Sequence, residues 1–416
     1  MKRRGLISKN KTYSFLFVTL FLDSYRFFAV GKRDITIWYI GAALIFFMAL
    51  ISPTTIIQGI KRNPWSAIMP IYMIINFLIV GESGTTSIYI GLLCWLFYVF
   101  SFRRSTINQF MKTVGIFQKG MNIFAIYGIY QFIANLFGLP LSSLWIEGIM
   151  VDGYNWGNTI KIAGFVLRRS NGIFREPSYF SQFLAMNILI YFVQIINHSL
   201  SGIINERKAF VRIIINGVAL ILTFSGTGLL LLVSSAIILM LINNPMETRK
   251  FIRKHSISLA LAVIAIIMIM AIPNPVTKYF LSRTSEFDYT NIHSISGYLR
   301  MILPYQAAIE VITLVNPLFG LGIGNATIYR LVKNGMYVGY SIQPIIPRTF
   351  VEEGLIGGII LFFFTIKTWN KKNIRILPAY TAILIGTYMM SFMHGTWSSE
   401  VFWLFLGFLN VELIPS

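Results

Sequence analysis

Apolar stretches long enough to form membrane-spanning helices follow one another along most of this chain. A helix needs about 20 apolar residues to cross a hydrocarbon core of roughly 30 Å, and only helices or closed barrels satisfy their backbone groups there. Uncharged runs such as 257–272 lack the alternation of a barrel strand, so they predict helices. We expect an all-α polytopic membrane protein, a single integral membrane domain over residues 1–416, with about twelve transmembrane helices. The predicted spans are residues 12–30, 35–53, 66–81, 86–102, 115–137, 178–197, 210–225, 227–243, 256–273, 349–366, 376–393 and 398–412.

Two long polar segments, residues 139–177 and 274–348, interrupt this pattern. Lys and Arg near span ends favour the cytoplasmic side, and basic groups such as residues 2–4, 207–212 and 367–375 fall on alternate connections. On the opposite side the short connections carry only Lys32 and Arg33, which predicts that both termini are cytoplasmic. The two long segments then form loops on the outer face of the membrane, where we look for chemistry.

The composition supports the membrane class and excludes others. Hydrophobic residues make up 56% of the chain and charged residues 12%, and the mean hydropathy is +0.68, which rules out an ordinary soluble domain. The net charge of +20 follows from membrane topology and attraction to anionic lipids, so no nucleic-acid partner is expected. Cys94 is the sole cysteine and the four His residues are scattered, so we expect no metal site and no cofactor.

The first long loop ends in a compact group of charges, Arg168, Arg169, Arg175 and Glu176, directly before the span that begins at residue 178. Guanidinium forks match phosphate oxygens and stay charged at any working pH. At the membrane surface such a group can hold the pyrophosphate of a lipid carrier whose tail remains in the bilayer. The simpler alternative is a solvated loop that contacts lipid headgroups.

The run Arg169-Ser-Asn-Gly-Ile-Phe-Arg-Glu-Pro177 resembles the signature of the O-antigen ligase and Wzy-type polymerase superfamily of membrane glycosyltransferases. Three further segments are similar to that family and follow in its order: 222–228, then Arg300 heading a helix that leads to the Gly-rich run 316–325, and 353–357. The alternative interpretation of the Gly-rich run is a flexible turn.

This resemblance implies a GT-C-type glycosyltransferase on the periplasmic face of a bacterial inner membrane, acting in lipopolysaccharide or related polysaccharide biosynthesis. Its implied partners are undecaprenyl-pyrophosphate-linked glycans as donor and acceptor, membrane lipids and a chain-length-determining co-polymerase. The ligase branch carries a His shortly before the Glu that matches Glu353, whereas this chain has Gln343 and Pro344 and no His in 345–353. We therefore expect an O-antigen polymerase, with ligase-type transfer to a lipid or protein acceptor as the alternative.

The leaving pyrophosphate needs fixed cations. Arg169 and Arg300 are the first candidates because both match the family pattern, and Arg168, Arg175 and Arg348 are further candidates for substrate binding. No Asp-x-Asp metal motif occurs in the chain, which favours a clamp that works without metal.

An acceptor hydroxyl needs a base or an orienting carboxylate, although pyrophosphate is a leaving group good enough to react without a strong one. Glu176 and Glu353 are the catalytic candidates, and Asp152 and His394 are further ionisable candidates. Glu352 is expected to pair with Arg348 or to form an ion pair at the end of the span. His394 could reach the substrate or could be a satisfied interfacial residue. Aromatic residues including Tyr179 could stack on sugars or belong to the aromatic belt of the membrane interface.

A lipid-linked oligosaccharide flippase is the competing class, because about twelve spans with both ends inside also fit a transporter. Such transporters are typically built from internal repeats. No repeat relates residues 1–200 to 210–416, and long charged outer loops do not suit a rocking carrier, so we favour the enzyme.

Overall fold

The computed structural model describes residues 9–22, 24–30, 33–81, 85–151, 157–162, 164–197, 205–242, 250, 253–254, 277–279, 296–327, 330–333, 336–339, 342, 344–393 and 400–414. Most of these residues are helical, as predicted, and the strands form only two-stranded ribbons. The helices are α1 Lys9–Thr19, α2 Ile37–Ile51, α3 Pro53–Arg62, α4 Trp65–Val80, α5 Thr85–Phe100, α6 Ile107–Phe137, α7 Pro177–Ile196, α8 Glu206–Leu222, α9 Gly226–Ile242, α13 Ser296–Met301, α14 Leu303–Glu310, α15 Ile345–Thr368, α16 Lys371–Ile376, α17 Pro378–Met393 and α18 Glu400–Leu409, with the short turns η1 Leu20–Leu22, η3 Val311–Val315 and η4 Asn325–Thr327. The strands are β1 Phe28–Val30, β2 Arg33–Ile35, β3 Arg103–Thr106, β4 Thr159–Ile162, β5 Phe165–Arg168, β6 Arg330–Lys333, β7 Met336–Gly339 and β8 Val411–Ile414.

Three helical segments of the described chain are long and apolar enough to cross a membrane: Ile107–Phe137, Pro177–Ile196 and Ile345–Ile376. A fourth results if α2 and α3, which meet at a bend of 102°, count as one span. A described helix overlaps each predicted span except 256–273, which lies outside the described residues. The described residues thus carry three or four membrane-length helices rather than about twelve, because the other apolar helices are shorter than the about 20 residues needed.

The first predicted span, residues 12–30, is wrong in its second half. Helix α1 ends at Thr19, and the following backbone pairs with the first long loop instead. The Arg26 N–H donates to the Ile149 carbonyl at 2.7 Å, and the Val151 N–H donates to the Ser24 carbonyl at 3.0 Å. Polar residues after η1 favour this pairing over continuation of the helix.

Helix α7 lies at the centre of the packing. It contacts α6, α8, α9 and α17, and nearly all of its side chains are buried, as expected for a helix that is apolar on every side. Beside it, α1, α6 and α18 interlock through aromatic rings: Phe17 packs edge-on against Phe408 at 4.9 Å, and Phe117 packs against Phe405 at 5.6 Å. This core holds the loop that precedes α7 on a rigid base.

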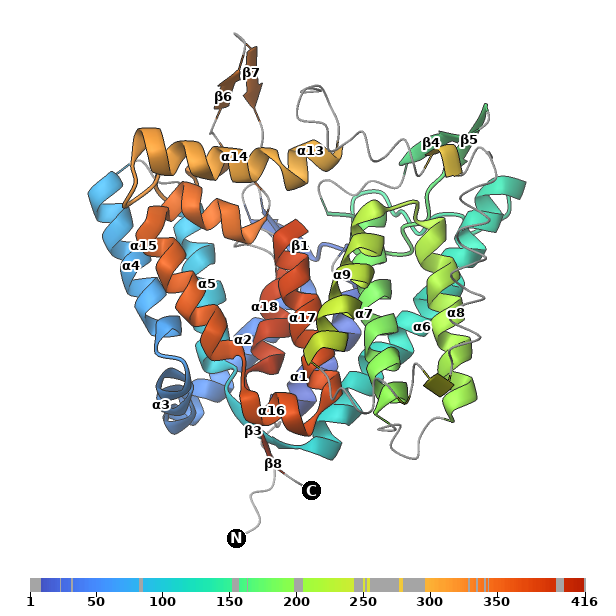
Figure 1. The fold of residues 1–416 in the computed structure, drawn as a ribbon, viewed down its shortest axis with the longest axis horizontal. Coiled ribbons are helices and arrows are strands. Elements are labelled where there is room, and N and C mark those ends of the chain that lie inside the picture. The colour runs from blue at the N-terminus through green and yellow to red at the C-terminus, as the bar shows by residue number, and fades with distance from the viewer. Residues whose placement is uncertain are drawn as a thin grey trace.

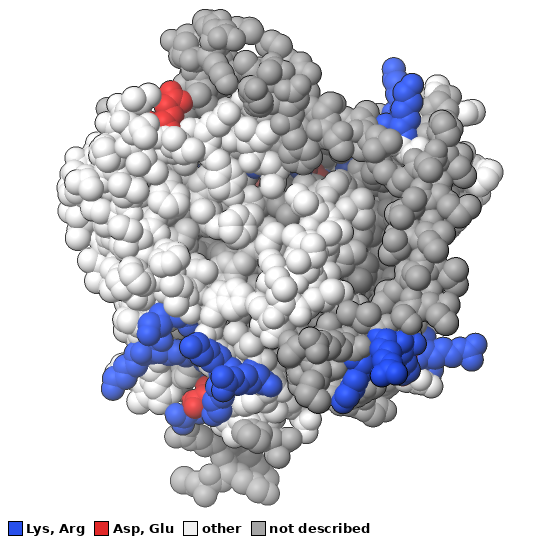
Figure 2. Space-filling view, viewed as in Figure 1, with Lys and Arg blue, Asp and Glu red and all other residues white. Residues whose placement is uncertain are grey.

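Both ends of the chain meet at the same end of the molecule (Figure 1). Strand β8 pairs in parallel with β3, and the Lys9 ammonium donates to the carbonyls of Phe100 and Phe102. Figure 2 shows that Lys and Arg gather at this end. The basic residues on the elements that reach it include Lys61, Arg62, Arg207, Lys208, Lys367, Lys371, Lys372 and Arg375.

The second polar segment, predicted as a long loop with a helix headed by Arg300, contains the helices α13 and α14. Helices α13 and α14 and the π-helical turn η3 lie across the end of the molecule opposite β3 and β8 (Figure 1). Residues Leu303–Val315 form a short apolar helical segment. The segment therefore forms a helical cover over that end.

Candidate functional site

The loop Arg168–Ser178, which leads from β5 into α7, is folded around the side chain of Gln131 on α6. The Gln131 Oε1 atom accepts hydrogen bonds from the backbone N–H groups of Asn171 and Gly172 at 3.0 and 2.9 Å, and from the Ser170 hydroxyl at 3.1 Å. Its Nε2 donates to Asn171 Oδ1 at 3.1 Å. Gln131 is buried and satisfied, so it fixes the backbone that follows the first two arginines of the loop.

Arg169 is anchored to the break between α8 and α9. Its Nε donates to the Thr223 carbonyl at 2.8 Å, and its Nη1 donates to Asn158 Oδ1 at 3.5 Å. The next residue in the chain, Ser170, donates its backbone N–H to the Leu222 carbonyl at 3.2 Å. Two of the segments singled out in the sequence, 169–177 and 222–228, are therefore in direct contact.

The break itself is built from small and hydroxyl side chains. Phe224 adopts a positive φ of 47°, and the Thr223 hydroxyl donates to the Leu220 carbonyl at 2.6 Å. A Cβ added at Gly228 would lie 2.4 Å from the Cβ of Ser181, so glycine allows α9 to approach α7 closely. The Thr223 carbonyl can accept a hydrogen bond from Arg169 because it lies at the end of α8, where the helical hydrogen-bond ladder stops.

Arg300 and Glu176 form an ion pair at the start of α7. The Nη2 atom of Arg300 lies 3.3 Å from Glu176 Oε2, and the Ser178 hydroxyl donates to the same oxygen at 2.9 Å. The side chains of Arg300 and Glu176 are 20% and 29% exposed, so solvent and ligands can reach the pair. Glu176 also stands at the N-cap of α7, where a helix dipole favours a negative charge.

The structure places three further candidates, Arg168, Arg175 and Tyr179, on or next to the first loop. Arg168 donates from Nη1 to Asn135 Oδ1 on α6 at 3.3 Å. Arg175 and Tyr179, directly before and within the first turn of α7, are both half-buried. His394 and Asp152 lie outside the described residues.

Arg348 belongs to a second charged group, inside α15. Its Nε donates to Glu352 Oε1 at 2.8 Å, one helical turn further on, and the two side chains are only 8% and 1% exposed. This buried pair matches the partnership expected for Glu352. Arg348 is therefore engaged within its own helix rather than displayed on the loop surface.

Glu353, which follows Glu352 in the chain, is fully buried at an interruption of α15. Gly354 has φ 65° and ψ −161°, which breaks the helix. Neither carboxylate oxygen of Glu353 has a hydrogen-bond partner among the described residues. A Cβ at Gly357 would lie 2.7 Å from Glu353 Oε2, so this glycine provides the space that the carboxyl group occupies.

The Gly-rich run is docked onto this interruption and is not merely a flexible turn. The backbone N–H groups of Leu321 and Gly322 donate to the carbonyls of Val351 and Glu352 at 2.8 and 2.9 Å. A Cβ at Gly320 would lie 2.6 Å from the Val351 carbonyl, so only glycine permits the approach. Backbone groups freed by the break are satisfied by the turn, as a buried break requires.

Two residues of α4 that sequence reasoning missed hold these segments together. The Tyr72 hydroxyl donates to the Glu353 carbonyl at 2.5 Å, and Asn76 Nδ2 donates to the Phe319 carbonyl at 2.7 Å. Gln131 was missed as well. All three are polar side chains inside otherwise apolar segments, which is the signal that could have identified them.

The two charged groups lie at the end of the molecule that is covered by α13 and α14 (Figure 1). Figure 2 shows basic and acidic atoms within a recess near this end. Arginines next to a partly exposed carboxylate can bind an anion and position a hydroxyl. Within the described chain no group of three or more His, Cys, Asp or Glu side chains could hold a metal ion.

Comparison of the sequence with protein-family models and with curated proteins finds no match.

Proposed function

We propose that this protein is a membrane glycosyltransferase that joins undecaprenyl-pyrophosphate-linked oligosaccharide repeat units into O-antigen or a related surface polysaccharide, on the periplasmic face of a bacterial inner membrane. One observation carries the proposal: Arg300 of the second polar segment pairs with Glu176 of the first, on the loop into α7 that also holds Arg169. A partly exposed carboxylate beside fixed guanidinium groups suits transfer from a pyrophosphate carrier. The long apolar helices suit a substrate whose tail stays in the bilayer.

In this reaction the acceptor hydroxyl oxygen bonds to C1 of the donor sugar while the bond between C1 and the pyrophosphate oxygen breaks. The bonding electrons leave with the pyrophosphate, and the hydroxyl proton passes to a carboxylate. Arg169 and Arg300 stabilise the charge that develops on the leaving group. Because Arg300 pairs with Glu176, a diphosphate would compete for this guanidinium and release the carboxylate.

Glu176 is the better candidate for accepting the proton. Its side chain is 29% exposed, so an acceptor hydroxyl can approach it. Glu353 is fully buried, and its backbone carbonyl accepts a hydrogen bond from the Tyr72 hydroxyl. These contacts suit a structural role in α15 better than proton transfer.

Arg169→Ala and Arg300→Ala, each expressed in cells that lack the native protein, test the proposal. Both variants should insert normally and should lose long polysaccharide chains, leaving single repeat units on the outer acceptor, with transfer reduced about 10²–10³-fold. Arg104→Ala is the matched control, because its pair with Glu412 is exposed and lies at the opposite end. Normal ladders from either site variant would refute the proposed site, and loss of every attached glycan would indicate a ligase.

A lipid-linked glycan transporter is the second candidate, and the interruption of α15 favours it. Broken helices with buried ionisable groups are typical of transporter sites, and Glu353 and Gly354 have this arrangement. Accumulation of repeat units on the cytoplasmic leaflet in the deletion strain would identify a flippase. Accumulation on the periplasmic leaflet supports the glycosyltransferase.

A further inference from the structure

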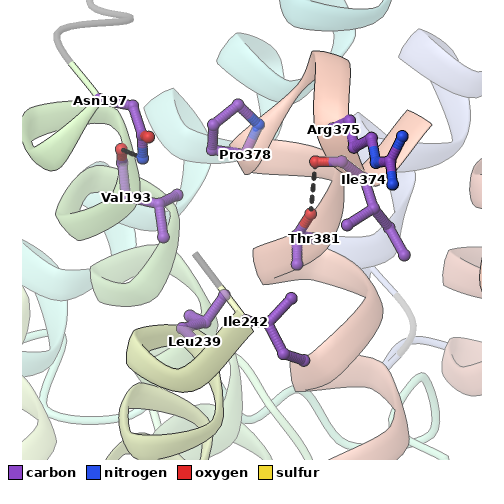
Figure 3. Close-up of a pocket in the computed structure, with 8 residues that line it drawn as sticks. All are labelled: Val193, Asn197, Leu239, Ile242, Ile374, Arg375, Pro378 and Thr381. Carbon is purple, nitrogen blue, oxygen red and sulfur yellow. Dashed lines mark hydrogen bonds between the residues drawn. The ribbon is translucent and has the colours of Figure 1, made fainter. Parts of the chain in front are cut away.

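A cavity of about 370 Å³ lies between four helices, far from the charged groups described above (Figure 3). Its walls come from the C-terminal ends of α7 and α9 and from α16 and α17. The volume falls within the about 300–1,000 Å³ of small-molecule sites. The lining residues are Val193, Asn197, Leu239, Ile242, Ile374, Arg375, Pro378 and Thr381.

The lining combines apolar side chains with one guanidinium group and two uncharged polar side chains. Val193 and Leu239 are 1% and 2% exposed, and Figure 3 shows Leu239 and Ile242 together on one side of the space between the helices. Asn197 lies beside Val193 on one side of this space, and Arg375 lies beside Ile374 on the opposite side. None of the eight lining residues is acidic. This arrangement fits an amphiphile with an anionic head.

The charge around the cavity is positive, like that of Arg375 in its lining. Helix α16 also carries Lys371 and Lys372, both exposed, and it lies at the end of the molecule where Lys and Arg gather in Figure 2. Basic pockets between membrane helices on the cytoplasmic side bind anionic lipid head groups. A soluble anion would have no use for the apolar wall, whereas an acyl chain would cover it.

We propose that this cavity binds an anionic glycerophospholipid of the adjoining leaflet. The lipid phosphate pairs with Arg375, and one acyl chain covers Val193, Leu239 and Ile242. The inference requires that the protein resides in a membrane, and it does not depend on the glycan chemistry at the other end.

Lipid binding to the purified full-length protein, measured by native mass spectrometry, tests this site. Phosphatidylglycerol should bind, phosphatidylcholine should bind much more weakly, and Arg375→Gln should weaken phosphatidylglycerol binding at least about tenfold. Lys372→Gln is the matched control, since it removes the same charge from the same helix without lining the cavity, and it should change binding less than about twofold.

A second variant fills the cavity and keeps the charge. Ile242 is 41% exposed, so Ile242→Trp should fold, and it should also reduce phosphatidylglycerol binding. Unchanged binding in both Arg375→Gln and Ile242→Trp would overturn the site. An equal loss in Lys372→Gln would show diffuse charge attraction instead, and displacement by millimolar inorganic phosphate would identify a soluble anion as the ligand. This binding assay contains no glycan substrate, so its result is independent of the proposed glycosyltransferase activity. A negative result would refute only the lipid site, and a positive result would not support the glycosyltransferase.

Discussion

Nη2 of Arg300 lies 3.3 Å from Oε2 of Glu176, although 124 positions separate the two residues in the chain. Arg300 belongs to α13, within the second long polar segment, and Glu176 ends the first. Their contact joins the two segments at the start of α7, which is the central buried helix. A substrate bound here would touch both segments at once.

Breaking this pair should change activity much more than stability. The two side chains are partly exposed, so the pair contributes no more than about 1 kcal/mol to folding. Glu176→Gln and Arg300→Gln should each leave the melting temperature almost unchanged and reduce polysaccharide transfer by about 10²-fold or more. Glu412→Gln, which breaks the exposed pair with Arg104, should leave both properties unchanged. A large loss of stability together with normal transfer would assign the pair a structural role.

The adjacent residues Glu352 and Glu353 should respond differently to the same substitution. Glu352→Gln removes the partner of the buried Arg348 guanidinium, which should cost about 3–5 kcal/mol of unfolding free energy. Glu353→Gln removes no hydrogen bond among the described residues, so it should be neutral or slightly stabilising. Thermal unfolding of the two variants in the same detergent measures the difference. Equal destabilisation would show that Glu353 has a partner in the folded protein.

Gly354 should tolerate no side chain. A Cβ there would lie 2.4 Å from the Leu318 carbonyl, and the residue has a φ of 65°. Gly354→Ala should cost more than about 3 kcal/mol, because backbone strain and a clash with the docked turn add together. Gly138→Ala is the control: it has the same φ of 65° with nothing within 4 Å, and it should cost only about 1 kcal/mol. Similar melting temperatures for the two variants would argue against close docking of the turn.

Lys9 should make stability depend on pH at the end where the chain termini meet. Burial, followed by repulsion from Arg103, lowers the pKa of Lys9 from 10.5 to about 8. Below pH 8 the group is protonated in both the folded and unfolded chain, whereas between pH 8 and 10.5 only the unfolded chain holds the proton. Stability should therefore gain from this group as the pH rises through that window.

Unfolding measured from pH 7.5 to 10.5 tests the effect of Lys9. Lys9→Met should remove this rise, and Lys11→Met, at an exposed position on the same helix, should retain it. An identical pH profile for Lys9→Met and the wild type would exclude the lowered pKa.

Helix positions could be predicted because a helix in an apolar run depends only on residues that are close together in the sequence. Predicted spans such as 178–197 and 349–366 coincide closely with α7 and α15, since an uninterrupted apolar run has no better way to satisfy its backbone. The first span failed after Thr19, because its polar residues found partners on a loop that is distant in the sequence. In the second long segment the helix expected after Arg300 is present as α14. Its position across one end of the molecule could not be predicted, because that position depends on tertiary contacts.

By itself, the sequence determined the helical class, the places where helices form, and the residue types available for chemistry at the two polar segments. The tertiary structure decided which of those residues meet. Arg169 lies against Thr223, Arg300 pairs with Glu176, and Arg348 turns inward to Glu352. Local patterns specify which groups are polar or charged, but the partner of a distant group depends on how helices pack. The glycines and the buried Tyr72, Asn76 and Gln131 that set this packing act through contacts that no nearby residue encodes.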